Sequence, residues 1–185
     1  MAYTESQIIN RVSTVLHDTT QAIWSTATIR QGIDDALVEI AGYAPYIVKA
    51  TVTTSAGTKD VDISSVTDLL EVNEVEFRID KDPKRFRRFE IRQSILRMDI
   101  DFEPDASENV RLYCAKPHVL SGTTVNTLSP EEERILIDLV ASRLAINKAV
   151  DFVDKVNVGG GRPGVEMQGW GEAKLALSLK SLRNL

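Results

Sequence analysis

The chain has 185 residues, 43% of them hydrophobic, and a formal net charge of −5, which are typical values for one globular domain with an appendage. This charge gives no general reason to expect nucleic-acid binding, and a single cysteine, Cys114, excludes an intramolecular disulfide. No signal-peptide pattern opens the sequence and no run approaches the ~20 apolar residues of a membrane span, so we expect an intracellular protein with no membrane contact.

The first forty residues predict two helices, over 4–18 and 26–41. Thr4 and Gln7 form a capping box for the first helix, and Ser25 or Thr26 can cap the second. The apolar side chains of the second helix recur at helical spacing and face the expected core: Ile29, Ile33, Ala36, Leu37 and Ile40.

From 46 to 120 the apolar residues alternate, which predicts a β-rich insertion of about six short strands, mostly joined as hairpins. In the first expected hairpin, "SAGTKD" turns the chain between Val52 and Val61. The apolar positions change from odd to even near Gln93 and Ser94, so a turn or bulge is expected there.

A third helix is predicted over 130–150. Ser129 caps it, Pro130 occupies its first position and Glu132 completes a capping box. Alanines at 141, 145 and 149 allow a close helix contact, and we expect this helix to pack on the first two. The order helix, helix, strands, helix predicts an α+β fold, in which a small helical bundle within a core of residues 1–157 carries the β insertion.

The region 158–185 is expected to be a glycine-rich joint followed by a C-terminal helix. Gly159, Gly161 and Gly164 match the G-x-G-x-x-G pattern of a dinucleotide-binding loop. That loop requires a preceding strand, whereas the segment before these glycines is helical in pattern. Pro163 also lies inside the would-be loop, between Gly161 and Gly164. We therefore interpret the glycines as a flexible joint: Gly159, Gly160, Gly161 and Gly164.

Beyond the joint, Leu175, Leu179 and Leu182 form one helical stripe, flanked by Leu177 and Leu185. A helix of this length is marginal alone in water, so the stripe needs a surface to cover. Two alternatives follow: the helix folds back on its own domain, or the joint lets it reach a neighbouring subunit or another protein.

No arrangement of side chains indicates catalysis, a cofactor or a metal site, and we expect the protein not to be an enzyme. His17 ends the first expected helix, where a cation favours the helix dipole, and His118 is expected at the surface. Cys114 alternates with Leu112 as a small core side chain, and Trp24 and Trp170 are interpreted as packing anchors.

Charge is unevenly distributed between residues 78 and 108. A basic lobe contains Arg85, Arg87, Arg88 and Arg92, and an acidic lobe follows with Asp99, Asp101, Glu103 and Asp105. Three interpretations stay open: a solvated hairpin with internal pairing, a contact between the basic lobe of one subunit and the acidic lobe of the next, and DNA contact by the arginines.

Three segments resemble the head-to-tail connector proteins of tailed bacteriophages, also called adaptor or head-completion proteins. They are "WSTATIRQGIDDALVEIAGYAP", "VTDLLEVNEVEFRIDKDPKRFRRFEI" and "ENVRLYCAKPHVL…TLSPEEERILIDLVASRLA", within residues 20 to 150. The resemblance implies a structural virion protein whose ring, twelve-fold in the virion, joins the portal to the neck or tail and forms part of the DNA channel.

The resemblance also implies the partners and the interfaces. These are the portal, a neck or tail-completion protein, further copies of the chain, and DNA that passes without sequence recognition. The location would be the virion neck, and the host cytoplasm before assembly. The portal-facing candidates are Trp170, Leu175, Leu177, Leu179, Leu182 and Leu185. The alternative function is a nucleic-acid-associated packaging or regulatory factor that uses the basic hairpin at 78–97.

Overall fold

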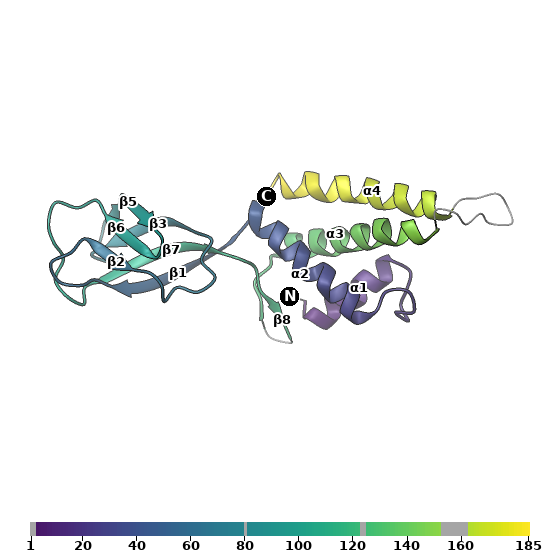
Figure 1. Cartoon of the computed structure of the whole chain (residues 1–185), viewed down its shortest axis with the longest axis horizontal. Coiled ribbons are helices and arrows are strands. Elements are labelled where there is room, and N and C mark those ends of the chain that lie inside the picture. Colours follow the sequence, from purple (N-terminus) through teal and green to yellow (C-terminus); the bar gives the residue numbers. More distant parts are fainter. Residues whose placement is uncertain (1–2, 80, 123–124, 153–162) are drawn as a thin grey trace. The chain divides into compact units, whose positions relative to one another are not determined.

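The computed structural model describes residues 3–79, 81–122, 125–152 and 163–185. The chain forms two compact units, and one is inserted into the other (Figure 1). The helical unit comprises residues 1–45 and 118–185, and the β unit comprises residues 46–117. The predicted α+β fold is therefore confirmed.

Four α-helices lie within the described residues of the helical unit, and three of them begin at strong caps. Thr4 and Gln7, and likewise Ser129 and Glu132, form reciprocal capping boxes, while the Ser25 hydroxyl accepts from the Thr28 amide. The helices are α1 (Glu5–Val15), α2 (Thr26–Tyr43), α3 (Pro130–Ala149) and α4 (Pro163–Leu182), with a 3-10 turn at Val150–Phe152 and a small hairpin, β8 (Leu120–Ser121) with β9 (Val125–Asn126).

Helix α3 is the centre of this unit and contacts the other three helices, α4 most extensively. Its buried side chains lie on several faces, which explains why α3 can support neighbours on more than one side. The core of the unit includes Ile8, Val12, Ile29, Ile33, Ile40, Leu136, Leu139, Val140 and Leu182.

The part of the β unit that the structure describes forms two antiparallel sheets. The four-stranded sheet has the order β1-β7-β3-β4, and the three-stranded sheet has the order β2-β6-β5. A shared apolar core contains Val52, Val61, Val75, Phe77, Leu96, Met98, Val110, Leu112 and Cys114. The strands are β1 (Tyr46–Thr53), β2 (Asp60–Asp62), β3 (Glu71–Phe77), β4 (Phe86–Arg87), β5 (Phe89–Arg92), β6 (Ile95–Met98) and β7 (Asn109–Lys116).

The expected hairpin between the first two strands is wrong. β1 pairs with β7, and β2 pairs with β6 in the other sheet. Both strands bury apolar side chains in one core, so alternation alone could not distinguish pairing side by side from packing of two sheets. The turn expected at Gln93–Ser94 is confirmed, because β5 and β6 pair across it and Gln93 has a φ of 55°.

The compact units also divide the chain differently from the predicted core of 1–157 with an appended 158–185. Helix α4 belongs to the helical unit, and the separate unit is the β insertion. Gly159, Gly160 and Gly161 of the predicted joint lie outside the described residues.

Candidate functional site

The leucines predicted to face a portal divide into a buried set and an exposed set. Leu182 is 1% exposed within the helical core, and Leu175 and Leu179 pack against the same core. Leu177 is 66% exposed and Leu185 is 47% exposed. The helical stripe predicted from the spacing therefore covers the chain's own core, which is the fold-back alternative.

Small residues bring α4 close to α3. A Cβ atom at Gly171 would lie 2.7 Å from Ile146 Cγ1 and 2.9 Å from the Ser142 carbonyl oxygen. The Ser178 side chain is buried one heptad further along α4, and the Lys174 Nζ lies 2.8 Å from the Asp138 Oδ1 of α3. These contacts lie along the middle of α4, and Leu182 at its C-terminal end is buried in the same core, so the helix is an integral part of the bundle.

Gly164 is not part of a joint. It lies in the first turn of α4, where a Cβ atom would be 2.9 Å from the Ala149 carbonyl oxygen and 2.8 Å from the Phe152 carbonyl carbon. The residue is glycine because α4 starts against the end of α3, and a side chain there would collide with backbone that cannot move aside.

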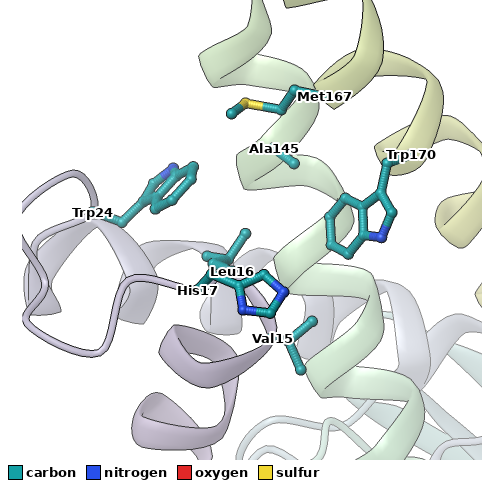
Figure 2. A pocket seen from close by; sticks show the side chains of 7 residues that line it. All are labelled: Val15, Leu16, His17, Trp24, Ala145, Met167 and Trp170. Atoms are coloured by element: carbon teal, nitrogen blue, oxygen red, sulfur yellow. The ribbon is translucent and has the colours of Figure 1, made fainter. Parts of the chain in front are cut away.

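An apolar pocket of about 270 Å³ lies where the end of α1, α3 and α4 meet (Figure 2). Trp24 from the loop before α2 is nearly buried beside it, whereas Trp170 of α4 is 41% exposed. The pocket is lined by Val15, Leu16, His17, Trp24, Ala145, Met167 and Trp170. Its chemistry suits an apolar or aromatic group, and Trp170 serves as one of its walls as well as a packing residue.

Neither histidine lies where the sequence predicted it. His17 is exposed at the pocket, two residues beyond the end of α1, and not within that helix as expected. The expectation of a surface position for His118 is wrong: it is buried, its Nε2 lies 2.7 Å from the Ala44 carbonyl oxygen, and its Nδ1 lies 3.2 Å from Thr127 Oγ1. His118 thus connects the two segments that enter and leave the β unit.

The charged lobes lie in the β unit, and most of their side chains are exposed. Arg92 pairs with Glu90, with 2.9 Å between Nη2 and Oε1. The other seven residues of the two lobes form no ion pair with any described residue. Arg87 differs from its neighbours because its Nε is buried without a hydrogen-bond partner in the described structure.

A buried acidic residue was missed by the sequence analysis. Glu76 of β3 is fully buried, and its Oε2 accepts from Tyr113 Oη at 3.1 Å and from Arg111 Nη1 at 3.3 Å. Glu76 lies between two core positions, Val75 and Phe77, so the alternation of apolar residues predicted that its side chain faces solvent. The sequence therefore carried no sign that this glutamate is buried. The Nζ atoms of Lys49 and Lys84 lie 5.7 Å and 5.8 Å from the centroid of the Tyr113 ring.

Cys114 is buried in the β core, as predicted, and desolvation raises the pKa of its thiol. Among the described residues, no group of three His, Cys, Asp or Glu side chains could hold a metal ion. No described helix has the length and hydropathy of a membrane span.

Comparison of the sequence with protein-family models finds no match, and comparison with curated proteins finds no significant match either.

Proposed function

We propose that the chain is a structural virion protein that forms a ring between the portal of a tailed bacteriophage and its neck or tail. The observation that supports this most strongly is the architecture: a helical unit interrupted between α2 and α3 by a β unit. A small helical bundle with a β-rich insertion is what the resemblance to head-to-tail connectors implies. The proposed ring surrounds the DNA channel and carries out no reaction.

The proposed portal contact uses the outer surface of α4 rather than a released helix. The inner leucines hold α4 against α3, which leaves Trp170, Leu177 and Leu185 with exposed apolar surface. The pocket beside Trp170 can receive an apolar side chain of the partner. A rigid site of this kind binds without the cost of ordering a free segment.

The contact between subunits in the ring is proposed to join the basic lobe of one chain to the acidic lobe of the next. Arg85 and Arg88 are exposed, as are all four acidic residues of the second lobe. Since these charges lack ion-pair partners among the described residues, they are available for a head-to-tail contact.

The nucleic-acid alternative has less support. Two arginines of the 78–97 hairpin are paired with acidic residues, Arg92 with Glu90 and Arg97 with Asp60, which reduces the positive field of that face. A steep fall in duplex-DNA affinity between about 50 and 200 mM salt would favour this alternative over the connector.

The test is to mix the purified full chain with the portal protein encoded in the same genome and to image the mixture by electron microscopy. We expect a ring of this protein on one end of the portal. Co-purification should weaken when Trp170 and Leu177 are both replaced by serine, whereas replacing Val38, an exposed residue of α2, is the matched control. Absence of any complex at micromolar concentrations would refute the proposal.

A further inference from the structure

β1 is an unprotected edge strand. It lies at the end of its sheet, next to β7 (Figure 1), and runs for eight residues. Its pairing with β7 continues without a bulge from Tyr46 to Thr53, and the strand contains no proline. Proteins usually shorten, bend or interrupt such edges because their free amides and carbonyls attract another strand.

The residues whose backbone faces outward can be identified from the ladder. The Thr54 amide donates to the Glu108 carbonyl at 2.9 Å, so even-numbered residues of β1 exchange hydrogen bonds with β7. The amides and carbonyls of the odd-numbered residues point to the open edge: Ile47, Lys49, Thr51 and Thr53. Outside the sheet ladders, no hydrogen bond between described residues uses these groups.

Lys49, the one charged residue of β1, does not block access to the open edge. Lysine commonly protects an edge strand by extending from it into solvent. The Lys49 Nζ instead lies 5.7 Å from the centroid of the Tyr113 ring, over the chain's own sheet. The open edge is therefore accessible to a second strand.

We propose that β1 pairs antiparallel with β1 of a second copy of this chain, in the register centred on Ala50. This register places Ile47 opposite Thr53 and Lys49 opposite Thr51, both as hydrogen-bonded pairs, so the strands can exchange about eight hydrogen bonds. Shifting the centre to Lys49 would set two lysines directly opposite each other, which is unfavourable.

The proposed pairing also continues the core face of the sheet. On that face Val48 lies opposite Val52 of the second copy, and Ala50 lies opposite Ala50, so apolar side chains meet apolar side chains. The contact is two-fold and closed, and it is distinct from the head-to-tail contact of the proposed ring. The inference does not depend on the connector function, and describes the chain free in solution.

Sedimentation equilibrium of the full chain tests the proposal. We expect a dimer at tens of micromolar, and a monomer for Thr51→Pro, because proline removes an outward amide and places its ring in the path of the second strand. The β1–β7 ladder does not use that amide. Thr51→Val keeps the amide and should remain dimeric. A monomeric wild type, or a Thr51→Pro dimer with unchanged affinity, would overturn the proposal.

A charge exchange tests the register and does not depend on how well the proline variant folds. Thr51→Lys places a lysine opposite Lys49 at two symmetric positions and should weaken the dimer roughly 2-fold to 30-fold. Adding Lys49→Glu to that variant places opposite charges at both positions and should restore the affinity. Unchanged affinity in Thr51→Lys, or no recovery in the double variant, would contradict the pairing centred on Ala50.

Discussion

Replacing Gly171 with alanine should weaken the helical unit, whereas the same replacement at Gly169, two residues earlier in α4, should strengthen it. The two positions differ in what a new Cβ atom would meet. At Gly171 it would lie 2.7 Å from Ile146 Cγ1 and 2.9 Å from the Ser142 carbonyl oxygen, whereas at Gly169 it would meet no described atom within 4 Å beyond the adjacent backbone of its own helix.

The change in unfolding free energy at each position follows from two opposing contributions. Alanine is favoured over glycine by about 1 kcal/mol within a helix, and this gain applies at both positions. At Gly171 the new methyl group overfills the contact between α3 and α4, which costs about 1–3 kcal/mol. The helix propensity cancels in the comparison, so the two variants should differ by about 1–3 kcal/mol in unfolding free energy. For a chain of this size that is a melting-temperature difference of about 2–12 °C.

Thermal unfolding followed by circular dichroism at 222 nm measures this difference, because the helical signal comes from the helical unit. Wild type should melt between Gly171→Ala and Gly169→Ala. Equal stabilisation by both substitutions would mean that α4 is not packed against α3 at Gly171. That result would refute the claim that α4 is an integral part of the helical unit.

Three further predictions concern other parts of the molecule. Leu182→Ala should cost about 2–5 kcal/mol in urea unfolding because its side chain is buried, and Leu177→Ala, at an exposed position of the same helix, should change stability by less than about 0.5 kcal/mol. The Asp18 carboxylate accepts from the amides of Trp24, Ile23 and Ala22, which lowers its folded-state pKa. The contribution of this carboxylate to the free energy of unfolding is therefore present above the unfolded pKa of about 3.9 and is lost as the pH falls through the lower folded pKa. The difference in unfolding free energy between wild type and Asp18→Asn should shrink between about pH 5 and pH 2. A difference that stays constant over this range would contradict the prediction. Reversing the exposed Arg85 and Arg88 to glutamate should reduce assembly of the proposed ring on the portal, measured by light scattering of the two proteins mixed at low salt, whereas an unchanged particle size would exclude the intersubunit contact.

The helices and the α+β order could be predicted because their signals are local. Ser129, Pro130 and Glu132 specify the start of α3 within four residues, and the structure contains that capping box. The change of parity at Gln93 and Ser94 likewise predicted a turn or bulge, and the structure has a turn there between β5 and β6.

The errors concern contacts between residues far apart in the sequence. The pairing of β1 with β7 joins positions more than fifty residues apart, and alternation within each strand carries no information about that partner. Gly164 was assigned to a flexible joint and Gly171 was given no role, because the close approach of α3 that requires both glycines is visible only once both helices are placed. His118 was wrongly assigned to the surface, because its hydrogen-bond partners, the Ala44 carbonyl and the Thr127 hydroxyl, come from other segments of the chain.

The proposed portal contact uses the outer surface of α4 while that helix stays packed against α3, whereas the alternative requires α4 to leave α3. Locking α4 against α3 distinguishes the two. Cysteines at Asp138 and Lys174, which pair at 2.8 Å between α3 and α4, can be joined by a short bismaleimide. Cys114 should not compete, because it is buried and burial raises the pKa of its thiol.

The measurement is the affinity of the locked chain for the portal, compared with the same variant before cross-linking. If α4 acts as a fixed part of the helical unit, the two affinities should be equal. A large loss of affinity on cross-linking would show that α4 must leave α3 to bind, which contradicts attachment through the outer surface of a packed helix.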